Sequence, residues 1–230
     1  MKDDQALSID PAAAGEVWSI DADASLQSVL DSPECPPLLY ETLAGVLPWQ
    51  TRNETPVRRA LKSSRVAPQW LAALLALGAT VTLERGSGGP TEVVLESLLR
   101  QRVEGEISVL HVPLGGPDRR WGQAAVARTP ADEPIVMAIA VLALEDDVVR
   151  QARIALTGVW PELVGLAEAA DRLVGGPLDV ERIQAVATAV EEEVAPKGDF
   201  LGTAEYRRAM AGVLTRRALE SCLHQEAGDE

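Results

Sequence analysis

Apolar positions recur at helical spacing near the end of the chain, and the residues before them are those that start a helix. Gly202 allows a turn, Thr203 can accept hydrogen bonds from the first free N–H groups, and Glu205 favours the positive end of the helix dipole. Four arginines fall largely outside the apolar stripe: Arg207, Arg208, Arg216 and Arg217. The pattern therefore predicts an amphipathic helix from Thr203 whose buried stripe is Tyr206, Met210, Val213, Leu214, Ala218 and Cys222.

The preceding hundred residues read as strands followed by helices. Three strands are expected at 121–127, 135–144 and 148–156, and the middle one is apolar throughout, which predicts burial of both faces. Helices are expected at 162–174 and at 180–194, the second with Asp179 as its N-cap, before the terminal helix. The order predicts a three-stranded antiparallel sheet packed on a three-helix bundle.

The first half of the chain mixes helices and strands differently. Proline-led helices are expected through Leu47 and at 69–77, and strands at 80–84, 92–95 and 107–112, with residues 86–90 as a hairpin turn. The turn residues of 113–118 form a linker. These patterns predict an α+β protein with one domain at 1–114 and a second at 119–224.

Composition narrows the possible functions. The chain has 230 residues, 47% of them hydrophobic and 24% charged, as in globular proteins. A net charge of −14 argues against binding to nucleic acid or anionic membranes. The two cysteines, Cys35 and Cys222, are too few for a disulfide framework, an iron–sulfur cluster or a thiolate zinc site. Without a secretion signal or a membrane-length apolar stretch, a cytoplasmic location is expected.

Several short motifs in the second half carry a family resemblance. Along the chain they are the run from Asp132 to Val136, Ile-Ala-Leu-Thr-Gly-Val-Trp-Pro at 154–161, and Gly-Thr-Ala-Glu-Tyr-Arg-Arg at 202–208. In this order they resemble the C-terminal domain of the FAD-binding medium subunits of molybdenum hydroxylases, the xanthine dehydrogenase and carbon monoxide dehydrogenase type. The resemblance implies that the first half is the remnant of a PCMH-type FAD-binding domain, of which only the second subdomain is present.

The same resemblance locates the flavin site. In this family two glycine-bearing loops hold the FAD pyrophosphate with bare backbone N–H groups. The first loop has no match, because only Gly15 precedes the helix that begins at Pro36 and Pro37. The second loop aligns with residues 50–61.

The aligned second loop keeps some family residues and has lost others. It retains Gln50, Leu61 and the candidate cofactor-binding residues Arg52 and Asn53, but the paired glycines become Arg58 and Arg59. The asparagine after them becomes Ala60, and the next acidic residue becomes Gln69. The resemblance thus implies FAD as the cofactor. The residues themselves predict an impaired FAD site, because the first glycine-bearing loop is missing and the glycines of the second are replaced.

A basic cluster occupies the altered loop. Five cations, with only Glu54 opposing them, stand in an otherwise acidic chain, and positions 58, 62 and 65 share a face if the segment is helical. One interpretation is a solvated helix face with salt bridges to nearby carboxylates. The other is a docking patch for an acidic partner subunit or an anionic ligand, with Arg58, Arg59, Lys62 and Arg65 as its members.

The histidines and the tryptophans near the altered loop do not indicate a metal site or a catalytic site. His111 and His224 lack further ligands at metal-binding spacing, and no metal or catalytic set is predicted. Trp49 and Trp70 flank the altered loop, and we hypothesise that one of them fills the space of the absent flavin; a structure with both on the solvent side would reject this.

Three functions stay open. The chain can be a flavin-free structural or assembly component of a molybdenum hydroxylase complex, not catalytic on its own. It can be an electron-transfer flavoprotein subunit that binds FAD, or a stand-alone acidic binding protein on the same scaffold. The resemblance implies a molybdenum-cofactor subunit and an iron–sulfur subunit as partners.

Overall fold

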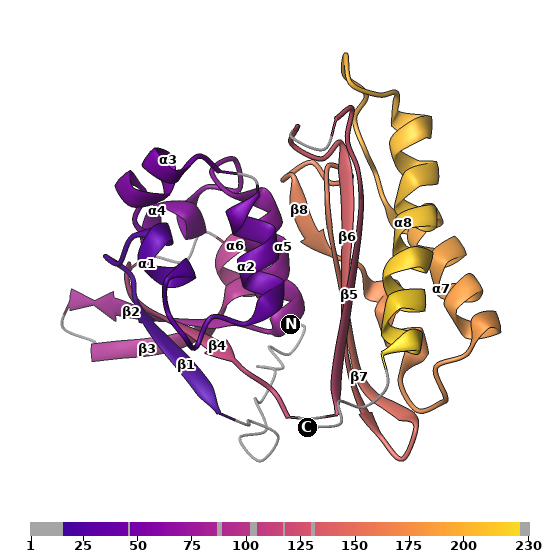
Figure 1. Cartoon of the computed structure of the whole chain (residues 1–230), viewed down its shortest axis with the longest axis horizontal. Coiled ribbons are helices and arrows are strands. Elements are labelled where there is room, and N and C mark those ends of the chain that lie inside the picture. The colour runs from indigo at the N-terminus through magenta and orange to yellow at the C-terminus, as the bar shows by residue number, and fades with distance from the viewer. Residues whose placement is uncertain are drawn as a thin grey trace, which may run out of the picture.

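The computed structural model describes residues 16–45, 47–86, 89–101, 105–116, 118–129 and 132–225. Within them the chain forms two four-stranded antiparallel sheets with helices packed around them (Figure 1). The α+β class predicted from the sequence is confirmed. No helix in the described ranges is both long and apolar enough to cross a membrane.

The first sheet has the strand order β1-β4-β2-β3. Its strands are β1 (Val17–Asp21), β2 (Thr80–Arg85), β3 (Gly89–Val94) and β4 (Glu106–Pro113). Buried and accessible residues alternate along β1 and the first part of β2, which leaves one face in the core and the other toward solvent. The antiparallel pairing of β2 with β3 is that of the expected hairpin, and residues 87 and 88 of its turn lie outside the described ranges.

Six helices accompany this sheet. They are α1 (Leu26–Leu30), α2 (Pro37–Ala44), α3 (Trp49–Glu54), α4 (Val57–Lys62), α5 (Pro68–Leu77) and α6 (Leu95–Arg100). Only α2 and α5 are predicted from the sequence. Strand β1 and helices α1, α3, α4 and α6 are too short for a clear periodic signal, and they form because neighbouring elements bury one side of them.

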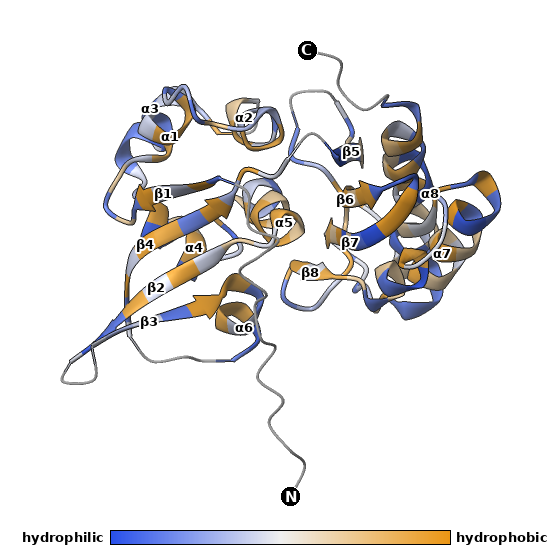
Figure 2. Ribbon diagram, turned by 90° about the horizontal axis from the view of Figure 1, so that it is seen from below, coloured by the Kyte–Doolittle hydropathy of each residue, from blue (hydrophilic) through white to orange (hydrophobic). Residues whose placement is uncertain are grey.

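Helix α5 lies between the two sheets (Figure 2). Every one of its residues is buried, and it contacts β4 on one side and strands of the second sheet on the other. Pro68 occupies the first turn, where its missing N–H costs nothing, and Gly78 ends the helix in the left-handed conformation at φ 77°. Arg119 donates to the carbonyl oxygens of Leu77 and Pro113, at 3.1 and 2.7 Å, and so ties the end of α5 to the connection between the sheets.

The second sheet has the order β5-β6-β7-β8. Its strands are β5 (Arg119–Val126), β6 (Val136–Glu145), β7 (Val148–Thr157) and β8 (Val164–Leu166). The prediction that the middle strand is buried on both faces is confirmed. Met137, Ile139 and Val141 belong to the core around α5, whereas the alternate residues face the helices on the opposite side.

The opposite face is covered by α7 (Val180–Glu193) and α8 (Ala204–His224), beside a short 3-10 helix, η3 (Glu168–Leu173). The expectation of three strands on a three-helix bundle is therefore wrong. Residues 164–166 of the predicted helix at 162–174 pair with β7 as a fourth strand, and Leu163 has a φ of 71° that no α-helix contains. Glu193 accepts from the N–H groups of Glu168 and Ala169 at 2.8 and 2.9 Å, which holds the rest of the segment as η3.

Helix α8 begins as predicted. The Thr203 hydroxyl accepts from the backbone N–H of Tyr206 at 3.1 Å. Its buried face includes Leu214, Ala218 and Cys222, as expected. Two positions were misassigned: Tyr206 is exposed, and Arg207, placed outside the stripe, is buried.

Candidate functional site

The segment aligned with the family's second flavin loop, residues 50–61, is mostly helical rather than an open loop. It forms nearly all of α3 and most of α4, with Thr55 and Pro56 between them. The sequence analysis considered a helix here only as the condition under which positions 58, 62 and 65 share a face, and it predicted neither α3 nor α4. Whether this segment can bind a phosphate therefore depends on which of its backbone N–H groups are free.

Arg52 is used to hold the fold together. Its Nε donates to Gln27 Oε1 at 2.8 Å, and one terminal nitrogen donates to the carbonyl oxygen of Ala44 at 3.0 Å and to that of Leu47. These contacts join α1 and the end of α2 to α3. Asn53 is exposed and donates to the carbonyl oxygen of Trp49 at 2.8 Å. Both retained residues thus make intramolecular contacts.

The first N–H groups of α4 are already hydrogen-bonded within the chain. Val57 donates to the carbonyl oxygen of Ala24 and Arg58 to that of Ala22, both at 2.9 Å. The next two N–H groups, of Arg59 and Ala60, donate to the Pro56 carbonyl oxygen at 3.0 and 3.4 Å. The backbone donors that a pyrophosphate cradle requires are therefore engaged by the protein's own carbonyl groups.

The four basic residues of the predicted patch have different environments. The Arg58 guanidinium lies 2.6 Å from Asp23 Oδ1 and 3.4 Å from Glu106 Oε1, as the solvated-face interpretation expects. Arg59, Lys62 and Arg65 are exposed, and none of them pairs with a carboxylate in the described part of the chain. Arg65 follows the end of α4, so the premise that it shares a helix face with positions 58 and 62 is wrong.

The two tryptophans beside the altered loop face opposite environments. Trp49 is 66% exposed, whereas Trp70, on α5, is fully buried. The condition that would reject our hypothesis, both indoles on the solvent side, is not met. That Trp70 fills the space of an absent flavin remains a prediction.

A cavity of about 310 Å³ lies between helices α2 and α5 and strands β5 and β6. Gln69, in the first turn of α5, is 1% exposed, and neither atom of its side-chain amide has a hydrogen-bond partner. Gln123 donates to Glu41 Oε2 at 2.5 Å, and its own Oε1 is buried without a partner. The cavity is lined by Glu41, Thr42, Gln69, Gln123, Ala124, Ala125, Pro134 and Met137.

Sequence reasoning missed this cavity because its walls come from distant segments. One signal was available: Gln69 is the only strongly polar residue in a helix that is otherwise apolar. A glutamine in a fully buried helix requires a partner, and the described structure offers it none.

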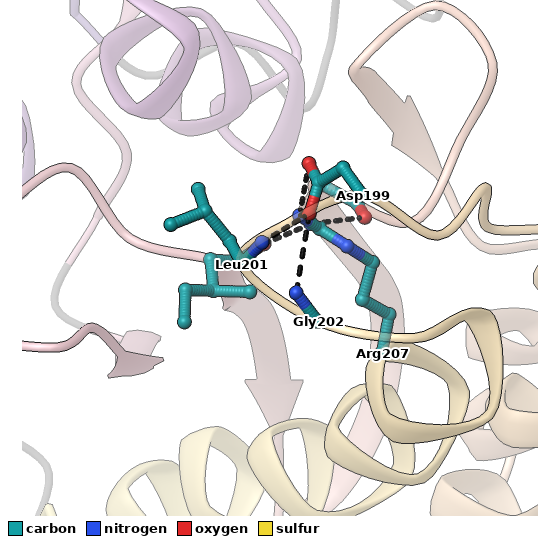
Figure 3. A network of polar contacts seen from close by, with 6 residues as sticks. Asp199, Leu201, Gly202 and Arg207 are labelled. Carbon is teal, nitrogen blue, oxygen red and sulfur yellow. Dashed lines mark hydrogen bonds and ion pairs between the residues drawn. The ribbon is translucent and has the colours of Figure 1, made fainter.

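A second polar centre ties α8 to the sheet (Figure 3). Arg207 is 5% exposed and donates to the carbonyl oxygens of Ile135 and Gly158, at 2.6 and 3.0 Å. It also donates to both carboxylate oxygens of Asp199, at 2.8 and 2.7 Å. Asp199 Oδ1 in turn accepts from the N–H groups of Leu201 and Gly202. The network joins the start of β6, the end of β7 and the turn before α8, and its role is structural.

The histidines and cysteines form no reactive set in the described residues. His111 lies between the hydroxyl groups of Ser19 and Thr82, at 3.0 and 2.8 Å from its ring nitrogens. Burial raises the pKa of the Cys35 thiol to about 11 and that of Cys222 to about 12, so both stay protonated at neutral pH. No cluster of metal-ligating side chains occurs in the ranges that the structure covers.

The fold and the motifs can now be compared with known proteins. Residues 124–222 match the family described as the CO dehydrogenase flavoprotein C-terminal domain. Its second half carries this domain, and the chain as a whole is similar to the medium subunits of carbon monoxide dehydrogenase and of other molybdenum hydroxylases. The resemblance stated from the sequence motifs is therefore confirmed.

Individual relatives support the assignment along most of the chain. The carbon monoxide dehydrogenase medium chain of Hydrogenophaga pseudoflava is 27% identical over 190 residues, which cover 80% of this chain and 66% of the relative. The nicotine 6-hydroxylase medium subunit of Paenarthrobacter nicotinovorans is 26% identical over 174 residues, covering 74% and 61%. The chain thus spans just under two thirds of the length of these relatives.

Solved structures agree. Carbon monoxide dehydrogenase from Hydrogenophaga pseudoflava superposes with a TM-score of 0.79 at 25% identity, over 91% of this chain and 76% of that one. Quinoline 2-oxidoreductase from Pseudomonas putida 86 gives a TM-score of 0.76 at 24% identity and supports the fold alone. Two antiparallel sheets with this arrangement of helices are thus a fold shared with these enzymes.

The Asp199–Arg207 pair predicts a pH-dependent stability. The hydrogen bond from Arg207 is the main reason that the pKa of the Asp199 carboxyl lies below its ordinary value. The pair therefore stabilises the fold above the unfolded pKa, about 3.9, and this contribution is lost as pH falls through the lower folded pKa. Asp199→Asn should lower the free energy of unfolding by about 1.5 kcal/mol at pH 7, a figure reduced for solvent screening because the Asp199 side chain is 44% exposed, and the difference should shrink below about pH 4.

Urea denaturation across this pH range checks the prediction. The control is Asp132→Asn, which removes an exposed ion pair with Arg128 at 3.6 Å and should change stability by less than about 1 kcal/mol. An Asp199→Asn loss that is the same at acidic and neutral pH would contradict the stated role of the carboxylate.

Proposed function

We propose that this chain is a medium-subunit homologue that serves as a structural or assembly component of a molybdenum hydroxylase-type complex and holds no flavin of its own. Its relatives are named as medium chains or medium subunits of carbon monoxide dehydrogenase and nicotine 6-hydroxylase. A molybdenum-cofactor subunit and an iron–sulfur subunit are the partners that this proposal assigns to it.

The proposal rests on one observation: the first backbone N–H groups of α4 already donate to carbonyl oxygens of the chain itself. Phosphate binding at a helix start needs free N–H groups that point at the anion. Here the N–H groups of Val57 and Arg58 would have to leave the carbonyl oxygens of Ala24 and Ala22 before they could reach a phosphate. Each exchange loses a hydrogen bond that already stabilises the fold, so the residues present do not fit the pyrophosphate of FAD.

The charged side chains around the start of α4 also disfavour phosphate binding. Arg58 is the side chain that replaces the first loop glycine, and it is engaged by Asp23 and Glu106. A phosphate arriving there would meet two carboxylates and an arginine whose charge is already compensated. The replacement of the first glycine by Arg58 therefore does not favour phosphate binding at that position.

The retained half of the scaffold supports the assembly role. The second sheet, α7 and α8 keep the family fold, and the Arg207 network fixes the entry to α8. In these elements the buried Cys222 thiol is protonated, and both terminal nitrogens of the buried Arg207 donate to protein oxygens. We therefore assign these elements a role in contact with partner subunits.

Purification and co-expression test the proposal. The chain is purified alone, incubated with excess FAD and desalted, and its visible absorbance is compared with that of a known flavoprotein treated identically. It is then co-expressed with the molybdenum-cofactor and iron–sulfur subunits of its own organism. We expect less than about a tenth of a flavin per chain and elution of all three subunits as one complex. A yellow protein with one FAD per chain would mean that the chain is an electron-transfer flavoprotein.

We also propose that Arg59, Lys62 and Arg65 dock an acidic surface of a partner subunit. They are exposed cations without ion pairs in the described structure, on a chain of net charge −14. Arg59→Glu/Lys62→Glu should weaken association about tenfold or more and reduce its salt dependence, as measured by surface plasmon resonance against the co-purifying subunits. Arg85→Glu/Lys197→Glu, which reverses one arginine and one lysine that are likewise exposed and form no ion pair in the described structure, is the matched control. Equal effects of the two double variants would exclude a specific patch.

A further inference from the structure

Two arginines without a carboxylate partner lie where the two sheets meet. Arg119 begins β5 and Arg153 lies in β7, on the face of the second sheet that packs against α5. The register places Arg119 opposite Ala143 and Arg153 opposite Val141, so only β6 separates their strands. Within the described ranges neither arginine forms an ion pair. Charged side chains that are partly buried are normally paired, so this pair requires an explanation.

Both side chains reach the end of α5, which lies between the sheets (Figure 2). Arg119 donates to the carbonyl oxygen of Leu77 at 3.1 Å. The Arg153 guanidinium lies against Gly78, where a Cβ atom would be 3.3 Å from its Nε and 3.4 Å from its Cζ. Burial and, second to it, the positive charge of Arg153 lower the pKa of Arg119. The two positive charges are therefore close together.

Capping of α5 explains only one of these arginines. The last turn of the helix is closed by the backbone N–H groups of the two residues that follow it and by Arg119. Arg153 donates no hydrogen bond to another residue of the described structure. Its side chain is half-buried, and none of its nitrogens is among the buried atoms that lack a partner, so they are open to solvent. An anion can thus reach Arg153 without displacing a hydrogen bond of the protein.

The surrounding groups favour a ligand with a single negative charge. The two guanidinium groups carry two positive charges, and the C-terminus of a helix such as α5 offsets about half of one. The carbonyl oxygens of Leu77 and Pro113 also face Arg119. A dianion would bring excess negative charge to these oxygens, whereas a monoanion is compensated. The two oxygens of a carboxylate match the planar fork of N–H groups that a guanidinium presents.

We propose that Arg153 and Arg119 form a binding site for the carboxylate group of a small organic acid with one negative charge. Arg153 holds the carboxylate through paired N–H groups, and Arg119 contributes the second positive charge. The inference goes beyond the proposed function, because it involves neither the segment aligned with the flavin loop nor a partner subunit.

Titration of the full chain with benzoate at constant ionic strength tests the proposal. Binding is followed by NMR through the Nε–H signals of the two arginines. Benzamide, a neutral molecule of the same shape, is the ligand control. We expect benzoate to shift the Arg153 signal until it saturates, and benzamide to bind at least about tenfold more weakly. An Arg153 signal that responds equally to benzoate and benzamide would overturn the proposal.

A pair of protein variants tests the part that Arg153 plays. Arg153→Lys keeps the positive charge but not the planar fork, so it should weaken benzoate binding about tenfold or more, as reported by the Arg119 signal. Arg150→Lys changes an exposed arginine of the same strand, which pairs with Glu145 at 2.7 Å, and should bind benzoate as the wild type does. Normal binding by Arg153→Lys, or equal weakening in the two variants, would contradict the proposal.

The acidic end of the chain is a second source of carboxylate groups. Gln225 Oε1 accepts from the backbone N–H of Trp121 at 3.0 Å, and Trp121 lies in the same row of the sheet as Arg153. The residues that follow in the sequence lie outside the described ranges, and they include Glu226, Asp229 and Glu230.

The same titration with Glu226→Gln/Asp229→Asn/Glu230→Gln distinguishes the two sources. Benzoate binding by the wild type supports a small organic acid as the ligand. Binding by the triple variant alone would make the chain's own carboxylates the occupant and overturn the small-acid ligand. Absence of binding by both proteins would overturn the site itself.

Discussion

The packing of α5 between the two sheets is the constraint on which the rest of the structure depends. A helix with every residue buried has to be covered on all sides, and here one sheet and its helices cover one side and the second sheet the other. The two halves of the chain therefore share a core, in which Met137 and Ile139 of the second sheet join residues of the first. The same packing places Gln69 and Trp70 in the interior, so the cavity is a consequence of how the halves meet.

Strong periodic patterns made much of this fold predictable from the sequence. The continuous apolar run of β6 predicted burial on both faces, and Pro68 marked the start of α5. The Thr203 cap predicted the start of α8. In each case one local signal extends over most of the element, so distant contacts reinforce what the sequence already favours.

The elements and residues that the sequence analysis misassigned have a different cause in common. Their structure depends on contacts with segments that are distant in the sequence. Residues 164–166 lie in a strand only because β7 offers an edge to pair with, and α3 and α4 are short helices stabilised by contacts such as those of Arg52 with α1 and α2. Arg207 looked like a surface residue until the carbonyl oxygens of Ile135 and Gly158 and the carboxylate of Asp199 surrounded it. The altered residues of the flavin loop could be identified from the sequence, but not the carbonyl groups that engage its donors.

The residues that match the family and the residues that depart from it therefore lie in different parts of the molecule. The second sheet and α8 keep the family fold. The start of α4, where the resemblance places a cofactor loop, has become a closed junction with the segment after β1. This contrast is the reason that we assign the chain an assembly role. It also explains why fold similarity to medium subunits and the chemistry of this site lead to different expectations.

The central claim is that the chain itself satisfies the N–H groups of Val57 and Arg58. It is tested most directly by NMR, which follows the hydrogen exchange and chemical shifts of these two backbone amides with and without saturating FAD. The account predicts slow exchange in the free protein and no shift of either signal when FAD is added. Rapid exchange in the free protein, with shifts that saturate as FAD is added, would contradict it.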